Sequence, residues 1–267
     1  MLRFAAIAMV LAGAAAADPT KQELARDSTE LATDCMKGDS LACEALATRY
    51  RFGLGIAKDE HKAVALYDRA CQAREASACR EEGLMIALGD GAPKDPAKAA
   101  ALFDTACTAS DAQACSFLAT LYYNGRGVPV DLAKAAALYD KACTGGDVDG
   151  CSSLGATYIN GEGVAKDVAK GLALLDKACT GNNKIACGAL AMRYLLGRDV
   201  AKDRARGVGY LQRGCQLGDG FACHALAREY RHGAGSAGDA SDADALEAKA
   251  CKLGYAKSCT KSPPPAP

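Results

Sequence analysis

The sequence predicts an all-α fold, a solenoid of short helical hairpins, and three observations carry this prediction. Cysteines recur with a strict period of 36 residues, apolar residues recur at helical spacing within each period, and glycine and aspartate recur at fixed places. A fixed period without insertions marks a repeat array, in which one unit is stacked to bury a continuous core. A second cysteine follows eight residues after each periodic one. The fourteen cysteines are Cys35, Cys43, Cys71, Cys79, Cys107, Cys115, Cys143, Cys151, Cys179, Cys187, Cys215, Cys223, Cys251 and Cys259.

Each repeat contains two predicted helices, and residues 114–149 show the pattern well. The first helix carries Leu118 and Tyr122 on one face and ends at Gly125, a residue type that suits the left-handed conformation after a helix. Asp131 then provides the N-cap of the second helix, which ends at the first cysteine of the next pair. Equivalent residues predict six full repeats over residues 42–257. The equivalent aspartates are Asp59, Asp95, Asp167, Asp203 and Asp239.

The two ends of the chain differ from the repeats. Residues 1–17 combine a basic start, an apolar stretch and the small residues Ala15-Ala16-Ala17, which is the pattern of a secretory signal peptide. The apolar stretch is too short to cross a bilayer, and no later segment reaches transmembrane length. We expect the solenoid over residues 18–260, with an additional helix before Cys35, and a proline-rich tail over residues 261–267. The mature protein should be periplasmic or secreted.

Composition argues against several classes of ligand. The chain has 32 basic and 32 acidic residues and a formal net charge of zero, so it lacks the basic surplus of a nucleic-acid-binding protein. Cysteine gaps of eight and 28 residues do not suit zinc, whose ligands are usually two to four residues apart. An even cysteine count in an exported chain instead predicts disulfides. We expect no metal and no cofactor.

The repeat pattern resembles the Sel1-like repeat, a relative of the tetratricopeptide repeat. With a cysteine pair in each repeat, the chain is similar to the secreted cysteine-rich Sel1 proteins of Helicobacter, and the resemblance implies a right-handed α/α superhelical solenoid. Local departures are Glu82, Gly83 and Ile86 in the second repeat, Asp199 in the fifth and Asp242 in the sixth. The residues that carry the pattern in the third repeat are Leu118, Ala119, Tyr122, Gly125, Gly127, Val128, Asp131, Lys134 and Ala135.

Two disulfide pairings are geometrically reasonable, because the start of the first helix and the end of the second lie at the same end of a hairpin. Pairing within a hairpin, such as Cys43 with Cys71, leaves Cys35 and Cys259 free. Pairing across the short turn, such as Cys35 with Cys43, uses all fourteen cysteines. The resemblance to the Helicobacter proteins implies the pairing across the turn.

The same resemblance raises an enzymatic alternative, since proteins of the Helicobacter group have been described as β-lactam-binding or weakly β-lactam-hydrolysing. Serine β-lactamases use an S-x-x-K motif together with S-D-N and K-T-G. The chain has one S-x-x-K, from Ser258 to Lys261, but neither companion motif. We therefore expect no catalytic residue and favour a non-catalytic protein. If the chain were an enzyme, a β-lactamase-like hydrolase would be the class.

The favoured hypothesis is a scaffold that binds a protein or an extended peptide. In tetratricopeptide-like stacks, one side of the first helix lines the concave surface, and the resemblance places residues of the central and last repeats there. They predict a groove with apolar and amide groups in its middle and a basic C-terminal end. The residues singled out for this groove are Tyr123, Asn124, Ile159, Asn160, Leu195, Arg228 and Arg231.

Overall fold

The computed structural model describes residues 27–233 and 242–259, and this part of the chain contains helices and no strand. The helices fall into two compact units, divided between residues 109 and 110. The predicted signal peptide 1–17 and the tail 261–267 lie outside the described residues. Among the helices within them, none combines the length and apolar character that a membrane span requires.

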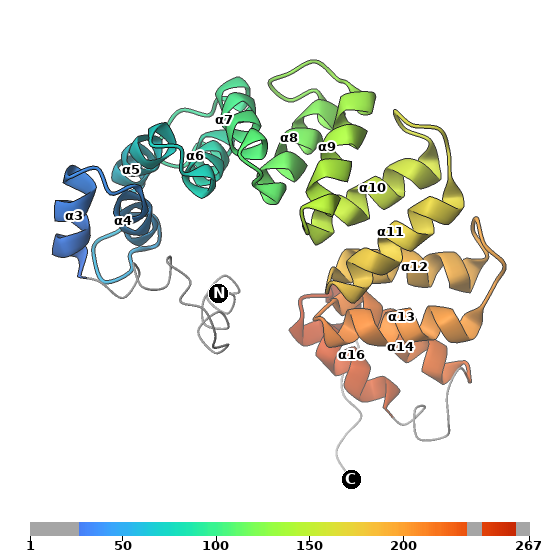
Figure 1. The fold of residues 1–267 in the computed structure, drawn as a ribbon. Helices are drawn as coiled ribbons and strands as arrows, with labels where there is room; N and C mark the ends of the chain where they lie inside the picture. Colours follow the sequence, from blue (N-terminus) through green and yellow to red (C-terminus); the bar gives the residue numbers. More distant parts are fainter. Residues whose placement is uncertain (1–26, 234–241, 260–267) are drawn as a thin grey trace, which may run out of the picture. The chain divides into compact units, whose positions relative to one another are not determined.

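The first unit contains the extra N-terminal helix and two hairpins, coloured blue to teal in Figure 1. The second helix of one hairpin packs against the first helix of the next, as α5 does against α6. The helices are α3 (Ser28–Met36), α4 (Ser40–Phe52), α5 (Glu60–Gln72), α6 (Ala76–Leu88) and α7 (Pro96–Thr108).

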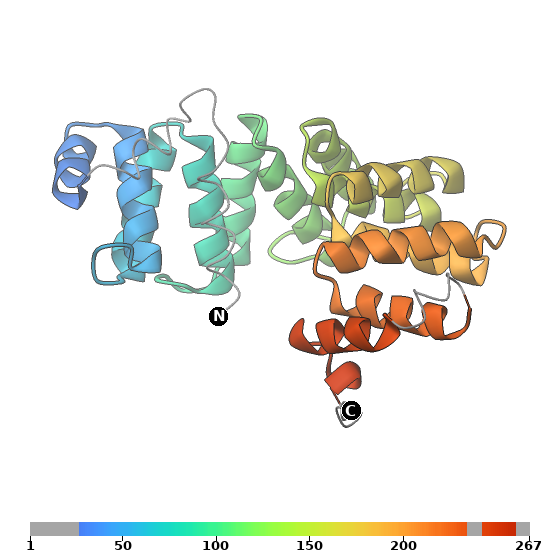
Figure 2. The ribbon, with the colours of Figure 1, turned by 90° about the horizontal axis from the view of Figure 1, so that it is seen from below.

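The second unit continues the same alternation, and Figure 2 shows its helices stacked as successive antiparallel hairpins. First helices are α8, α10, α12 and α14, and each packs against the second helix that follows it. The predicted all-α repeat solenoid is thereby confirmed. The helices are α8 (Ala112–Asn124), α9 (Leu132–Thr144), α10 (Val148–Asn160), α11 (Val168–Thr180), α12 (Lys184–Leu196), α13 (Arg204–Gln216), α14 (Gly220–Arg231), α16 (Ala243–Lys252) and α17 (Ala256–Cys259).

Side-chain caps begin the helices where the sequence predicts them. Asp131 accepts a hydrogen bond from the backbone N–H of Lys134, and Asp59, Asp95, Asp167 and Asp203 do the same at their helices. Each such cap contributes about 1 kcal/mol. Asp239 lies outside the described residues. The first helices have caps that sequence reasoning missed, at Asp39, Asp111, Asp147, Asn183 and Asp219.

A glycine three residues beyond the helix end allows consecutive repeats to approach closely. Gly163 has φ +70°, and a Cβ atom there would lie 2.2 Å from the carbonyl of Leu132 in the preceding repeat. Asp199 holds the equivalent position in the fifth repeat and adopts φ 62°. Aspartate is among the residues that tolerate the left-handed region best, so this departure from the pattern leaves the turn intact.

The cysteines pair across the short turn between repeats. The structure joins Cys35 to Cys43 and Cys71 to Cys79, and it repeats this local connection at 143–151, 179–187, 215–223 and 251–259. Cys107 and Cys115 are also disulfide-bonded. This is the connectivity that the Helicobacter resemblance implies. Most of these sulfurs are buried, whereas Cys259 is exposed.

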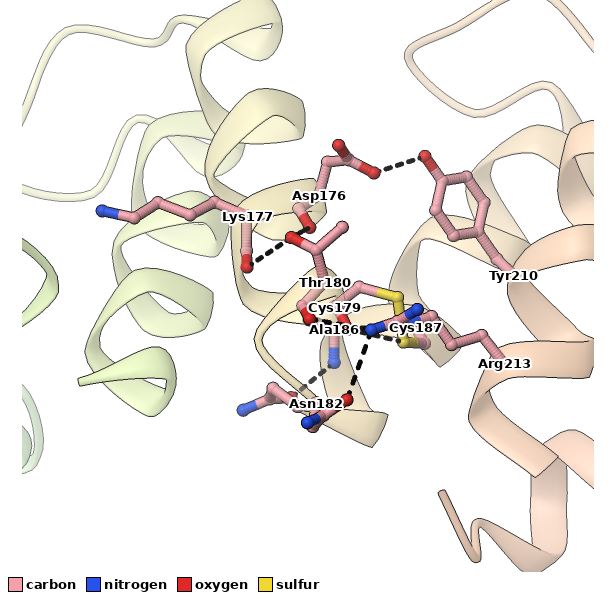
Figure 3. The surroundings of a disulfide bond; sticks show 10 residues. Asp176, Lys177, Cys179, Thr180, Asn182, Ala186, Cys187, Tyr210 and Arg213 are labelled. Atoms are coloured by element: carbon pink, nitrogen blue, oxygen red, sulfur yellow. Dashed lines mark hydrogen bonds between the residues drawn. A yellow bond between two sulfur atoms is a disulfide. The ribbon is translucent and has the colours of Figure 1, made fainter. Parts of the chain in front are cut away.

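In several repeats, a basic residue near the end of the second helix contacts the preceding repeat. The contact lies next to the disulfide of that preceding repeat. Arg213 Nε donates to the carbonyl oxygen of Cys179 at 2.9 Å, and Figure 3 shows its side chain lying against the turn that contains Asn182. Lys177 Nζ makes the equivalent contact with the carbonyl oxygen of Cys143 at 3.2 Å. These carbonyls lie at a helix C-terminus, where a positive charge is favourable, so each contact joins two repeats and caps a helix.

The second repeat buries a carboxylate where the others bury leucine. Glu82 is fully buried, as are Leu118 and Leu154 at the equivalent positions. Lys98 Nζ lies 3.0 Å from Glu82 Oε1, but Glu82 Oε2 has no hydrogen-bond partner among the described residues. Burial raises the pKa of Glu82 above its ordinary value, against the opposing effect of Lys98. The ionised carboxylate is therefore a cost to the fold at neutral pH.

We expect Glu82→Leu to stabilise the protein at pH 7 by about 1–3 kcal/mol, because an apolar side chain replaces a poorly satisfied buried charge. The raised pKa fixes the sign of the pH dependence. The cost of the charge is present above the folded-state pKa and disappears as pH falls below the ordinary value of 4.5. The advantage of the variant should therefore shrink in acid. Urea unfolding at pH 7 and pH 4 measures it, with Leu118→Glu as the reverse change. A less stable Glu82→Leu protein at pH 7 would contradict this account.

Candidate binding face

All seven residues predicted to line a groove lie in the second unit, on the last turns of its first helices. Tyr123 and Asn124 end α8, Ile159 and Asn160 end α10, and Leu195 lies one residue before the end of α12. Arg228 and Arg231 lie in the last turn of α14. The repeats therefore place them at equivalent ends of successive helices.

Ile159 is not available to a ligand, which corrects its assignment to the groove. Its side chain is 2% exposed and belongs to the core cluster formed by α8 to α12. Leu195, at the equivalent position of α12, is also largely directed inward and packs against the core around α13 and α14. The exposed apolar side chain at this end of α12 is the next one, Leu196, which is 49% exposed. Aliphatic residues at this position gain more from burial than from lining a surface.

Tyr123 occupies the same position as Ile159 and Leu195 but keeps its hydroxyl group in a polar contact. Its OH donates to Glu162 Oε2 at 2.9 Å, and Asn160 Nδ2 donates to Glu162 Oε1 at 3.2 Å. The hydrogen bond to Glu162 raises the pKa of Tyr123 above its ordinary value. Two consecutive repeats thus converge on one carboxylate. Glu162 was missed by sequence reasoning because it lies in the loop after α10 rather than on a helix face.

The two asparagines are not equivalent, although they are 36 residues apart. Asn124 Nδ2 donates to the carbonyl oxygen of Thr120 in its own helix at 2.9 Å, whereas Asn160 donates to Glu162. Both side chains are exposed. Each amide uses one donor bond locally, and the carbonyl oxygen of the exposed Asn124 has no hydrogen-bond partner among the described residues. A peptide backbone N–H is a suitable donor to that oxygen.

The two predicted arginines also differ. Arg231 Nη1 lies 2.9 Å from Glu247 Oε1 and its Nη2 lies 2.7 Å from Asp244 Oδ1, so its charge is compensated by α16. Arg228 is exposed, and its guanidinium makes no hydrogen bond or ion pair with the described residues. Of these two arginines, only Arg228 has a charge that no described residue compensates.

Arg231 belongs to a polar cluster that includes the only serine of an S-x-x-K pattern. His224 Nδ1 lies 2.9 Å from Glu247 Oε2 and 3.0 Å from Ser258 Oγ. A serine–histidine–carboxylate relay needs the hydroxyl on one ring nitrogen and the carboxylate on the other. Here both contacts are made by the same nitrogen, and Ser258 is 5% exposed. Lys261 lies outside the described residues. The geometry fits a structural contact between α14, α16 and α17.

Burial alone would raise the pKa of Glu247, but hydrogen bonds from Ser258, His224 and Arg231 outweigh it and lower the pKa to about 2. The carboxylate is thus ionised at neutral pH and accepts several hydrogen bonds. No group of three or more histidine, cysteine or acidic side chains is placed to hold a metal ion anywhere in residues 27–233 and 242–259. The exposed ends of the first helices remain the better candidate for binding.

Comparison with protein families finds the Sel1 repeat six times, at residues 40–74, 76–111, 112–147, 148–183, 184–219 and 220–255. The chain belongs to the Sel1 repeat family. These Sel1 repeats begin two residues before the repeats counted from the cysteine period, at the helix N-termini rather than at the buried alanines. A comparison with curated proteins gives no match.

Solved structures of other Sel1 repeat proteins are similar. One is c5321, a protective antigen of uropathogenic Escherichia coli, with 26% identity and a TM-score of 0.78 over 87% of this chain and 50% of that one. The chain thus spans half the length of the antigen. A Sel1 repeat protein from Oxalobacter formigenes has 23% identity and a TM-score of 0.74, over 85% of this chain and 99% of that one. Cysteine-rich protein B of Helicobacter pylori has 34% identity and a TM-score of 0.41, over 50% of this chain and 96% of that one.

Proposed function

We propose that the protein is an exported, non-catalytic scaffold that binds a protein or an extended peptide through the first-helix face of its second unit. We define this face as a set of exposed and half-buried residues near the ends of α8, α10, α12 and α14 and in the loops that follow the first three. Its members are Thr120, Tyr123, Asn124, Arg126, Asn160, Glu162, Leu196, Arg198 and Arg228. Sel1 repeats generally mediate protein interactions, which supports a binding role.

One observation carries this proposal. Consecutive repeats present different groups near the ends of their first helices: a tyrosine hydroxyl and two amides on α8 and α10, an exposed leucine on α12 and, on α14, a guanidinium without a partner among the described residues. An extended peptide also presents different groups at regular intervals, with a backbone donor and acceptor at each residue. The face therefore matches a peptide better than it matches a small molecule, which needs an enclosed pocket.

Export is supported by two independent features. The predicted signal peptide gives the route, and the described residues contain no free cysteine. Disulfides persist in oxidising compartments and are rare in the cytosol. A periplasmic or extracellular location is consistent with both, and mass determination of the mature N-terminus tests the predicted cleavage after Ala17.

The binding proposal is tested by capturing a partner with the oxidised protein and measuring affinities of variants. We expect Leu196→Ser and Asn124→Ala each to weaken binding by about tenfold, or about 1.4 kcal/mol, with little change in the thermal midpoint because both side chains are exposed. Ile185→Ser is the matched control, since Ile185 is an exposed apolar residue at the opposite end of α12. If the control weakens binding and Leu196→Ser does not, the wrong face has been assigned.

A further inference from the structure

Three arginines of the first-helix face have no compensating partner in the part of the chain that the structure describes. Arg126, Arg198 and Arg228 are exposed, and none of their guanidinium groups makes a hydrogen bond or an ion pair with the described residues. Elsewhere in the same unit, arginines are engaged: Arg204 binds Glu229, Arg213 binds backbone carbonyls and Arg231 binds two carboxylates. Unused guanidinium groups on a face of exposed polar and apolar side chains indicate a ligand with acceptor groups.

The repeat geometry places two of these arginines beside the residues already described. Arg126, Glu162 and Arg198 are 36 residues apart, and each follows a glycine in the left-handed conformation, with φ values of 65°, 76° and 68°. The same backbone geometry gives them the same place in their repeats. Since Glu162 reaches Tyr123 and Asn160, this column runs alongside the helix ends. Arg198 is two residues beyond the exposed Leu196 in the chain.

The uncompensated charge of this face is positive. Among Arg126, Glu162 and Arg198, only Glu162 is a carboxylate, and it is occupied by Tyr123 and Asn160. Asp199, which follows Arg198, is paired with Lys166 at 3.9 Å. The chain as a whole has equal numbers of basic and acidic residues, so the surplus is a property of the face and not of the protein.

We propose that the first-helix face selects an extended segment rich in aspartate or glutamate, a specificity that rests on the proposed binding function. A guanidinium group binds a carboxylate with two parallel hydrogen bonds, which gives direction as well as charge. Packed helices lie about 10 Å apart, so Arg126 and Arg198 are roughly 20 Å apart across two repeats. An extended chain rises about 3.3 Å per residue, so acidic residues about six positions apart reach both. Leu196, two residues before Arg198 in the chain, takes an apolar side chain from the segment.

Widely spaced single arginines favour an acidic peptide over a nucleic acid. Double-stranded DNA carries one charge about every 1.7 Å along its axis, and proteins that bind it neutralise several phosphates with a continuous basic surface. Here an acidic side chain held by hydrogen bonds, Glu162, lies in the column between two of the arginines. It would repel a continuous polyanion, whereas a peptide can place a neutral residue opposite it.

A library of random 14-residue peptides displayed on phage tests the inference with the full oxidised protein. We expect the selected peptides to be enriched in aspartate and glutamate, with pairs about six residues apart. Binding of a selected peptide should fall at least tenfold in the triple variant Arg126→Gln, Arg198→Gln, Arg228→Gln and should weaken as salt is raised. The control removes the same charge from exposed residues off this face, Arg74→Gln, Lys94→Gln and Lys252→Gln, and should bind within twofold of the wild type.

Each other outcome is decisive. Selected peptides without acidic enrichment, whose binding still depends on Leu196 and Asn124, would overturn the acidic specificity and leave the binding face in place. Peptides unaffected by any change on this face, or no selected peptide at all, would overturn the proposed function as well. A single-stranded oligonucleotide that competes with the peptides and binds more tightly than they do would replace the acidic peptide with a nucleic acid.

Discussion

After complete reduction of its disulfides, this protein is expected to be largely unfolded near 37 °C and to show no cooperative thermal transition. Each bridge closes a short local loop, and on the chain-entropy model such a loop contributes about 2.5 kcal/mol. Six bridges of this kind, together with the oxidised Cys107 and Cys115, amount to roughly 17 kcal/mol. Typical domains have a net stability of about 5–15 kcal/mol, so the reduced chain should have little left.

Circular dichroism melts with and without a phosphine reductant, followed by alkylation to block reoxidation, measure the effect. Partial reduction should open Cys251–Cys259 first, because Cys259 is exposed whereas both sulfurs of Cys179–Cys187 are fully buried. Peptide mapping of singly reduced protein reports the order. A reduced and alkylated protein that melts within a few degrees of the oxidised one would show that helix packing alone holds the repeats.

Substitution of Glu247 by alanine is expected to destabilise the packing of the last repeat. The change leaves His224 and Ser258 without a buried acceptor and removes one of the two carboxylates that bind Arg231. Removing one partner of a buried charged pair typically costs about 3–5 kcal/mol. In a repeat array the loss should remain local. Hydrogen exchange should therefore accelerate in α14 and α16 and stay unchanged in α10.

The pH dependence of this cluster follows from the lowered pKa of Glu247. A carboxyl group with a depressed folded-state pKa stabilises the fold above its ordinary value of 4.5, and this contribution is lost as pH falls toward about 2. The Glu247→Ala variant should not show this loss of folding stability as pH falls.

A second variant separates the cluster's role from simple disruption. Replacing Glu247 with leucine, His224 with serine and Ser258 with alanine restores the residue types found at equivalent positions, such as Leu211, Ser152 and Ala222. This triple variant should regain most of the lost stability. Equal instability of the triple variant and Glu247→Ala would contradict the interpretation.

The fold was predictable because each repeat supplies its own local signals. Asp131 caps a helix through the backbone three residues ahead, and Gly125 ends a helix through its own dihedral angles. Both effects are local, so both can be predicted from the sequence. The binding face was predictable only as a set of positions. Whether a residue at one position is buried, as Ile159 is, or exposes a hydroxyl group, as Tyr123 does, depends on its chemistry and on its neighbours in the adjacent repeat.

Contacts between side chains of different elements were outside the reach of pattern reasoning. Glu162 receives donors from two repeats, and Glu247 receives donors from α14 and α17. Both glutamates interrupt the period, since the equivalent residues are Arg126 and Leu211. Such interruptions are the signal that could have found them: a charged residue in a column of other residue types marks a place where the repeat does something that its copies do not.

The contacts of Lys177 and Arg213 with the preceding repeat bear on how the chain can change in length. Both side chains reach back 34 residues to the carbonyl oxygen of a cysteine at the same place in its repeat. Excision of residues 148–183 would therefore bring Arg213 to the carbonyl of Cys143, where Lys177 lies now. The junction formed after the deletion would contain the same kinds of partners as the one removed. Unequal recombination between copies of the repeat can thus lengthen or shorten this protein by whole hairpins without requiring a new kind of interface between repeats.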